Sequence, residues 1–431
     1  MSSGDRTRGG DGSGISRGPS LSLSEVLENP GLLKLELMTQ GLRLSDDLKS
    51  TLLDRGPSAF ATSYELDLVL PEGTVATVPI HPKLSHNSPY MLEKTDSGHQ
   101  ISADTKKVKV SLVAPPGFYD RKTSSGVPLG QFATMHGSYL ALSPISECEF
   151  LGSTDHCRFC NLQGTRPGSG NRVPVEDVVE AVRLAREERP IHMVYLSVGY
   201  IDGPDSGVHA LEPYVRAIKN AFSLLVAVDA LPPAEDMWID RTYAMGVDSV
   251  SYNLEIFGPK VFKEICPGPA RKLGRKRFLS ALSYATTVFN PGAVVCHLIV
   301  GLEPVTNTID GIDELVKRGV VPVLPVYRPF KGIDLRQSDE GNTEILHTED
   351  LGQVYAHLYN QLRKHKIPMG WVRDISVVTT PMEGRYFVGG ETRLGGFIQR
   401  MFNDPHRKPS PTLVDIRRNL RVRESSESTE A

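Results

Sequence analysis

The sequence has few cysteines and no long apolar run, and each absence excludes a class of protein. Its 431 residues include five cysteines, an odd and small number that argues against the dense disulfide framework of a secreted scaffold. No window reaches the roughly 18 consecutive apolar residues of a membrane-spanning helix. The first twenty residues also lack the apolar core of a signal peptide. We therefore expect a cytoplasmic protein without a membrane partner, whose thiols serve as ligands.

An excess of one charge is absent as well. The chain has 48 Lys and Arg against 51 Asp and Glu, which gives a formal net charge of -3. This balance provides no electrostatic basis for binding a polyanion. We expect no nucleic-acid partner.

The two ends of the chain contain little that can be buried. Residues 1–22 are rich in Gly and Ser and poor in aromatics, and residues 403–431 carry arginines followed by a Glu- and Ser-rich run. Such composition cannot offset the entropy lost on ordering. We expect a disordered leader at 1–22, a C-terminal extension at 381–402 and a flexible tail at 403–431.

Residues 23–135 predict a small α+β segment. Helical periodicity around Leu32 to Met38 is followed by apolar–polar alternation at 64–70 and 107–113. The alternation is typical of strands with one buried face. The sequence does not indicate the chemistry of this segment.

Residues 136–380 alternate short apolar runs with amphipathic stretches, which predicts βα repetition. The expected strands are 139–145, 191–198, 224–228, 249–254, 294–300 and 321–326, and the expected helices between them are 175–188, 210–221, 233–245, 275–288 and 309–318. Parallel strands in this order favour an open sheet or a barrel. Six βα units fit an α/β fold with a partial (β/α)6 TIM-type barrel, which a helix at 348–363 and a run at 375–379 would extend or close.

Three cysteines directly after the first of these strands are the strongest chemical signal. Cys148, Cys157 and Cys160 form a C-x8-C-x2-C pattern. The Cys-x-x-Cys half lets two sulfurs converge on one ion or cluster, and the third cysteine completes a three-thiolate face. An iron–sulfur cube with three protein ligands would keep one iron open for a substrate or cosubstrate.

A structural zinc site is the alternative that this spacing leaves open. Zinc in structural sites is usually bound by four ligands, and His156 is the nearest candidate for the fourth. Because His156 is adjacent to Cys157, however, the pair would have to bend back onto one ion. Cys266 and Cys296 are most simply interpreted as buried thiols.

The cysteine loop resembles that of the radical S-adenosylmethionine (SAM) superfamily. The aromatic Phe159 before the last cysteine matches the family pattern, whereas the first interval is longer than the common C-x3-C-x2-C. Among members with longer intervals, the nitrilase-cluster-associated proteins are the most similar, because an approach segment like 117–128 precedes their loop. The resemblance implies a [4Fe-4S] cluster on Cys148, Cys157 and Cys160.

The resemblance also assigns cofactor-binding roles to residues at the ends of later strands. Gly199 follows the second strand, where the family places a glycine-containing edge against the methionyl amine. Asn253 and Glu255 resemble the Asn-Leu-Asp/Glu element of biotin synthase and lipoyl synthase, which faces the ribose and methionyl groups of SAM. These residues are expected to bind SAM.

Two further elements follow along the chain. Arg275, with Arg271 and Arg277 as neighbouring candidates, occupies the position of an arginine that pairs with the SAM carboxylate, a task that suits a bidentate guanidinium. Gly301 and Glu303 resemble the family's G-x-I-x-G-x-x-E element near the adenine; the glycine allows close packing, and the glutamate is expected to brace a loop.

The implied activity is that of a radical SAM enzyme. Such an enzyme cleaves SAM reductively to a 5'-deoxyadenosyl radical, which abstracts hydrogen from a small-molecule substrate. A flavodoxin or ferredoxin-type protein is the implied electron donor. The alternative is a non-catalytic barrel with a structural zinc or an iron–sulfur sensor site. The identity of the substrate is not written in the sequence.

Overall fold

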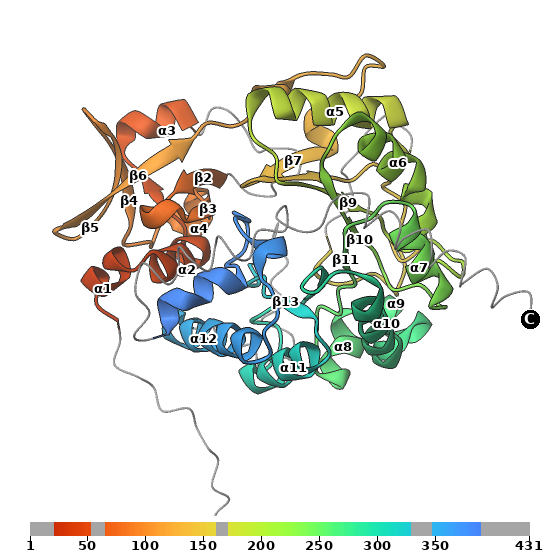
Figure 1. Ribbon diagram of the computed structural model, residues 1–431. Coiled ribbons are helices and arrows are strands. Elements are labelled where there is room, and N and C mark those ends of the chain that lie inside the picture. Colours follow the sequence, from red (N-terminus) through yellow and green to blue (C-terminus); the bar gives the residue numbers. More distant parts are fainter. Residues whose placement is uncertain (1–20, 53–64, 161–170, 329–346, 389–431) are drawn as a thin grey trace, which may run out of the picture.

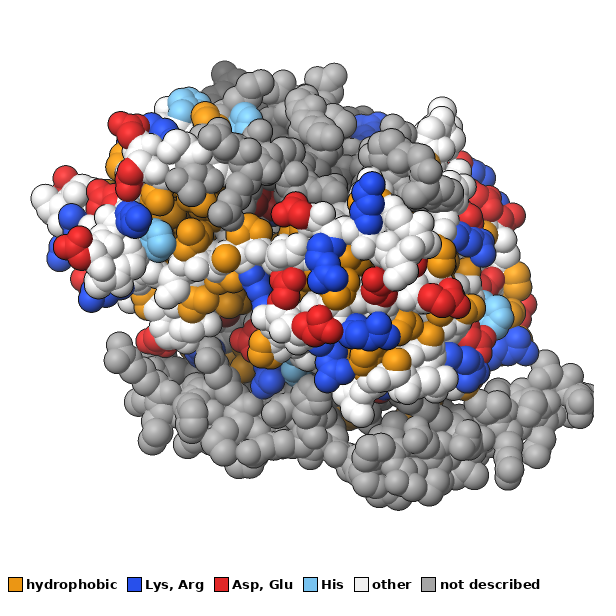
Figure 2. Space-filling view, turned by 90° about the horizontal axis from the view of Figure 1, so that it is seen from above, with side chains coloured by type: hydrophobic (Ala, Val, Ile, Leu, Met, Phe, Trp, Pro, Cys, Tyr) orange, Lys and Arg blue, Asp and Glu red, His pale blue; other side chains and the backbone are white. Residues whose placement is uncertain are grey.

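The computed structural model describes residues 21–52, 65–160, 171–328 and 347–388. The expected flexible tail lies outside the described residues, as does all but the end of the expected leader. No helix within these ranges is long and apolar enough to cross a membrane. On the face shown in Figure 2, acidic and basic side chains are interspersed, and no single charge covers a large area of it.

A seven-stranded sheet forms the larger part of the molecule. Its order is β13-β12-β11-β10-β9-β8-β7, and its strands from β8 to β13 are parallel neighbours in sequence order. Only β7 pairs antiparallel, with β8. The strands are β7 (Ala133–His136), β8 (Tyr139–Leu142), β9 (Met193–Ser197), β10 (Leu225–Asp229), β11 (Ser249–Ser251), β12 (Val294–His297) and β13 (Val321–Val323). All six expected runs therefore contain strands, and an α/β fold is confirmed.

Helices connect the parallel strands and cover the outer side of the curved sheet (Figure 1). Their apolar residues belong to the same core cluster as the strand residues, because one face of each amphipathic helix packs on the sheet. They are α5 (Val175–Glu188), α6 (Glu212–Ala221), α7 (Met237–Ala244), α8 (Pro259–Ile265), α9 (Pro267–Lys272), α10 (Gly274–Val288) and α11 (Val305–Lys317).

Helix α7 begins four residues later than predicted. The expected helix at 233–245 is shortened to α7, which starts at Met237. The Ala234 N–H donates to the Pro204 carbonyl at 2.9 Å, and the Pro233 carbonyl accepts from Arg277 Nε at 2.6 Å. The backbone before Met237 is thus held by residues outside the helix, which prevents the first turn from forming there.

The run at 375–379 was predicted to extend or close the sheet, and the structure contains no strand at these residues. Thr379 makes an isolated antiparallel bridge with Leu324, next to β13. The carbonyl of Ser376 instead accepts from Thr77 at 2.9 Å, and that of Asp374 accepts from Ser138 at 3.3 Å. The hydrogen bonds of this segment are divided between both sheets, so it cannot join one of them as a regular strand.

The N-terminal residues form a second, six-stranded sheet in the order β1-β4-β5-β6-β2-β3. Its strands are β1 (Arg43–Leu44), β2 (Glu65–Val69), β3 (Val75–Pro79), β4 (Met91–Thr95), β5 (Gly98–Ala103) and β6 (Lys106–Val113), and its helices are α1 (Leu23–Glu28), α2 (Pro30–Gln40), α3 (Asp46–Leu52) and α4 (Pro82–Ser85). A separate cluster of buried aliphatic residues forms its core. The described residues of this segment contain both helices and strands.

Helix α12 (Thr348–Lys364) and the short 3-10 helix η7 (Pro381–Phe387) follow the large sheet in the chain and pack against each other. Lys34 of α2 reaches Glu383 of η7 at 2.9 Å and donates to the Ile375 carbonyl at 3.1 Å. The N-terminal segment is therefore attached to the C-terminal end of the described chain through a buried ion pair.

Candidate functional site

The three cysteines of the loop follow β8, at the carboxyl edge of the parallel strands. All three thiols are partly exposed. Gly199, just past the end of β9, lies directly against Cys148: a Cβ added at Gly199 would be 2.5 Å from the Cys148 Cβ and 2.4 Å from the Glu147 carbonyl oxygen. Real Cβ contacts are never so short, so the close approach at this position requires a glycine.

The far half of the loop is held by the segment that joins α8 to α9. The Arg158 N–H donates to the Ile265 carbonyl at 2.9 Å, and the Gly268 N–H donates to the Asp155 carbonyl at 3.0 Å. Arg271 also forms an ion pair with Asp155. These contacts fix the backbone around Cys157.

Aromatic and polar contacts fix the near half. The rings of Phe150 and Tyr200 stack with centroids 4.6 Å apart. The Tyr200 hydroxyl donates to Asp202 at 2.7 Å, and the Asp202 N–H donates to the Glu149 carboxylate at 2.7 Å. The loop is therefore connected to the residues after β9 directly beyond Cys148.

The environments of the thiols differ. Burial raises the pKa of Cys148, although backbone N–H groups of Phe150 and Tyr200 oppose this by hydrogen bonding to the sulfur. A hydrogen bond from the Cys266 thiol lowers the pKa of Cys157. Donors to sulfur stabilise a thiolate, the form that binds a metal or cluster.

Cys157 also interacts electrostatically with Cys148 and with Glu255. Glu255, with φ of 65°, thus belongs to the same neighbourhood as the cysteines. Burial raises the pKa of its carboxyl far above the usual range, with further contributions from Asp229 and Cys157.

Among the described residues, no group of three or more His, Cys, Asp or Glu side chains is arranged to hold a metal ion. The predicted ligands Cys148, Cys157 and Cys160 are all within these residues. His156 is not hydrogen-bonded through Nε2.

Asn253 is held by the protein on both sides of its amide. Its Oδ1 accepts from the Ser251 hydroxyl at 2.6 Å and from the His297 N–H at 2.9 Å, and its Nδ2 donates to Asp229 at 2.9 Å. One Nδ2 hydrogen remains for a ligand. In this structure Asn253 is primarily a residue that orients Asp229.

Asp229 and Tyr195 were not identified from the sequence. Asp229 ends β10, and burial raises its pKa to about 7, while the Tyr195 hydroxyl opposes the shift. A signal was present: Asp229 is the one charged residue at the end of the apolar run Leu225 to Val228, where a carboxyl edge is expected.

The three candidate arginines have different partners. Arg271 pairs with Asp155 of the cysteine loop, and Arg277 pairs with Asp236 at 2.8 Å. The Arg275 guanidinium lies 4.0 Å above the ring of Phe257, and its charge acts on Glu303. It therefore lies beside the chain that follows β11.

Glu303 braces a loop, as predicted. Its carboxylate accepts from the N–H groups of Phe257 at 2.9 Å and Gly258 at 2.6 Å. Gly301 has φ of 99°, and its added Cβ would be 3.7 Å from Tyr327; the left-handed backbone, more than close packing, explains this glycine. Phe159 is partly buried and packs against the core of the large sheet.

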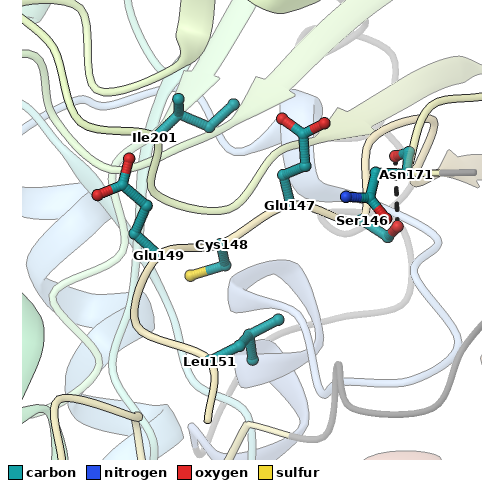
Figure 3. A pocket seen from close by; sticks show the side chains of 7 residues that line it. All are labelled: Ser146, Glu147, Cys148, Glu149, Leu151, Asn171 and Ile201. Atoms are coloured by element: carbon teal, nitrogen blue, oxygen red, sulfur yellow. Dashed lines mark hydrogen bonds between the residues drawn. The ribbon is translucent and has the colours of Figure 1, made fainter. Parts of the chain in front are cut away.

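A cavity of about 370 Å³ opens beside Cys148 (Figure 3). Glu147 and Glu149 flank the cysteine, and the remaining lining residues are Ser146, Leu151, Asn171 and Ile201. Arg172 pairs with Glu147 at 2.9 Å. The cysteine loop is thus reachable from solvent on this side.

Comparisons with known proteins give partial matches. No family model matches the chain. The bacteriochlorophyllide c C-7(1)-hydroxylase of Chlorobaculum limnaeum is 29% identical over 137 residues, which make up 32% of this chain and 34% of that protein. The match therefore covers about a third of the length of that relative.

Several solved structures are similar in part. Methylornithine synthase has a TM-score of 0.40 at 13% identity, covering 54% of this chain and 64% of that one. The hydrogenase maturase HydG of Carboxydothermus hydrogenoformans has a TM-score of 0.41 at 16% identity, covering 53% of this chain and 52% of that one. A radical SAM methyltransferase from Sphaerobacter thermophilus has a TM-score of 0.37 at 15% identity, covering 75% of this chain and 80% of that one. One of these partly similar structures is named as a radical SAM enzyme, the superfamily that the cysteine loop resembles.

Proposed function

We propose that this chain is a radical SAM enzyme with a [4Fe-4S] cluster on Cys148, Cys157 and Cys160. Its substrate is a small molecule from which hydrogen is abstracted. The identity of the C-7(1)-hydroxylase as an enzyme supports a catalytic role.

The observation that carries the proposal is the contact between Gly199 and Cys148, where a side chain has no room. It brings the edge of β9 against a proposed cluster ligand, at the end of the sheet where ligand sites of parallel α/β folds form. Backbone N–H groups of Phe150 and Tyr200 donate to the Cys148 sulfur, which would stabilise a thiolate ligand there, although burial raises the pKa of this thiol overall. The chemistry of the donor set therefore fits an iron–sulfur cluster.

When bound, the cluster supplies the electron for reductive cleavage of SAM, and the chain supplies orientation. We assign SAM contacts to Gly199, Asn253, Glu255, Arg275 and Gly301, with Phe159 packing behind the loop. Asn253 acts through its hydrogen bond to Asp229, which fixes that carboxyl at the end of β10. Glu303 holds the turn of Phe257 and Gly258, over which Arg275 is stacked.

The sequential parallel order of β8 to β13 and their outer helices support a partial (β/α)6 barrel for residues 136–380. The N-terminal α+β segment at 23–135 and an extension from 381 complete the proposed organisation. A flavodoxin or ferredoxin-type donor in the cytoplasm is the proposed source of electrons. The partly exposed loop beside the cavity at Cys148 suits electron entry.

Anaerobic purification tests the proposal. We expect a brown protein that contains iron and sulfide, and that releases 5'-deoxyadenosine when dithionite and SAM are added. Cys157→Ala is expected to abolish the cluster because a three-ligand site cannot lose a thiolate. As a matched control, Cys296→Ala removes a buried thiol of β12 and should leave the iron content unchanged.

A non-catalytic barrel with structural zinc or a sensor cluster is the less favoured alternative, since the similar proteins are named as enzymes. A colourless protein with stoichiometric zinc after anaerobic reconstitution would contradict the proposal. Equal loss of iron in the Cys157 and Cys296 variants would contradict the assignment of ligands.

A further inference from the structure

Three arginines border the cysteine loop, and each forms an ion pair with a carboxylate. The pairs are Arg172 with Glu147, Arg158 with Glu264, and Arg271 with Asp155. Glu147 directly precedes Cys148 in the chain, and Arg158 directly follows Cys157. Both halves of the loop are therefore bordered by arginine side chains.

In each pair the arginine is more exposed than its partner. The side chains of Arg158, Arg172 and Arg271 are 47%, 53% and 58% exposed, against 15%, 29% and 22% for the carboxylates that they contact. The arginines thus lie on the solvent side of these pairs. Because a guanidinium has five N–H donors and exposed ion pairs are weak, each arginine can also bind a carboxylate of another molecule.

The helices beside the loop are basic as well. Residues 259–277, which form α8, α9 and the start of α10, contain seven Lys or Arg and one acidic residue, whereas the whole chain has a net charge of -3. These helices lie next to one another (Figure 1). The bond from the Arg158 N–H to the Ile265 carbonyl attaches them to the loop.

Part of this charge is balanced by nearby carboxylates. Lys272 pairs with Asp202 at 3.1 Å, and Arg277 pairs with Asp236 at 2.8 Å. Lys263 is exposed, and no ion pair within the described ranges involves it. Five exposed basic side chains therefore lie beside the loop, and we call them the basic rim: Arg158, Arg172, Lys263, Arg271 and Lys272.

A protein that delivers an electron at the loop must dock close to it, because electron transfer slows steeply with distance. Complementary charge on two surfaces speeds their association and fixes the orientation in which they dock. A rim of exposed arginine and lysine side chains fits a partner with an acidic surface. Nucleic acid is also an anion, but the balanced charge of the whole chain does not favour it.

We propose that the basic rim is the docking surface for an acidic electron-donor protein of the flavodoxin or ferredoxin type. This inference rests on the proposed function, because it takes the loop to be the place where the electron is received. One electron leaves the donor for each docking event, and no covalent bond forms between the two proteins.

Cross-linking of the cluster-loaded, unaltered chain to an acidic flavodoxin tests the surface. A carbodiimide joins lysine ammonium groups of one protein to carboxylates of the other through amide bonds. We expect linked peptides that contain Lys263 or Lys272, and loss of these links in about 0.5 M salt, which screens exposed charges. Links concentrated at the exposed lysines of β6 would overturn the proposal; these are Lys106, Lys107 and Lys109.

The double variant Arg158→Gln, Arg172→Gln removes two charges of the basic rim. At low salt we expect kcat/KM for flavodoxin, measured by 5'-deoxyadenosine formation, to fall about tenfold. The rate with dithionite, which needs no docking surface, should change little.

The matched control is Lys49→Gln, Arg318→Gln. Lys49 lies in α3 of the N-terminal sheet, and Arg318 lies between α11 and β13, at the amino edge of the parallel strands. Its flavodoxin-dependent rate should equal that of the unaltered chain. Circular dichroism compares the folding of both variants, and the cross-linking result does not depend on either.

An equal fall of the flavodoxin-dependent rate in both double variants, or no fall in either, would overturn the proposal. Equally tight binding of a single-stranded oligonucleotide would do the same, because the rim would then bind any polyanion. A chain that forms no 5'-deoxyadenosine with dithionite would refute the proposed function, whereas cross-links at Lys263 or Lys272 in that chain would still support the docking surface. The two failures are therefore distinguishable.

Discussion

At the scale of single residues, the site depends on the hydrogen bonds that polar groups near the strand ends make with one another. Asn253 was predicted as a SAM-binding residue from its place beside Glu255. Its amide is already bonded to Ser251, His297 and Asp229. Because hydrogen bonds hold both the oxygen and the nitrogen of the amide, this asparagine fixes the geometry of the carboxyl beside it.

Gly199→Ala is expected to displace the cysteine loop, because the new Cβ would overlap the Glu147 carbonyl and Cys148. Overpacking of this kind costs about 1–3 kcal/mol. We expect a lower urea midpoint and reduced iron content after anaerobic reconstitution.

Gly117→Ala is the control, since its Cβ would meet its nearest atom, a carboxylate oxygen of Glu188, at an ordinary 3.5 Å. Similar losses in both variants would show that the contact at Cys148 has no special role.

At the scale of elements, the loop is held between the end of β9 and the junction of α8 and α9. Neither neighbour is close to the loop in sequence: Gly268 is more than one hundred positions beyond Asp155, to which it is bonded. The helical segments after β11 thus contribute to the conformation around Cys157, together with hydrogen bonds within the loop such as that from the Cys160 N–H to the Cys157 carbonyl at 2.9 Å.

Gly268→Ala should loosen this junction. Its Cβ would lie 2.5 Å from the Asp155 carbonyl and 2.7 Å from the Phe150 ring. We expect faster proteolysis within 150–160 and weaker iron retention.

Arg158→Ala removes an ion pair with Glu264 across the same junction, with the arginine side chain 47% exposed. Such a pair contributes about 0–1 kcal/mol, so iron retention should hardly change. A larger loss in Arg158→Ala than in Gly268→Ala would contradict the importance of the backbone contact.

At the scale of the whole molecule, two sheets with separate cores are joined by the N-terminal helix α2 and the C-terminal η7. The Lys34 side chain is fully buried, and burial lowers its pKa while Glu383 opposes the shift. The pair joins residues near the two ends of the described chain. Because both side chains are buried, either one without its partner would be a buried charge.

Lys34→Met should therefore destabilise the chain by about 3–5 kcal/mol, the typical cost of leaving one buried charge without its partner. The double variant Lys34→Met, Glu383→Met should recover part of this loss. Urea unfolding measures both.

Lys49→Met is the matched control, because the Lys49–Asp46 pair is exposed at 53% and 96%. Its expected effect is small. Equal destabilisation by Lys34→Met and Lys49→Met would show that the buried pair does not join the two parts.

The sequence by itself predicted the six parallel strands, the helices α5, α6, α7, α10, α11 and α12, and the cysteine loop, because hydrophobic periodicity and ligand spacing are local patterns; it did not predict α8 and α9. It also predicted that Glu303 braces a loop. Only the tertiary structure decided which groups meet: Gly199 with Cys148, Asp229 with Asn253, and Arg158 with Ile265. These contacts join residues far apart in the chain, and no local pattern encodes them. The run at 375–379, which was predicted to extend or close the barrel, meets the large sheet only at the bridge between Thr379 and Leu324, since its Ser376 carbonyl accepts from Thr77 of the other sheet.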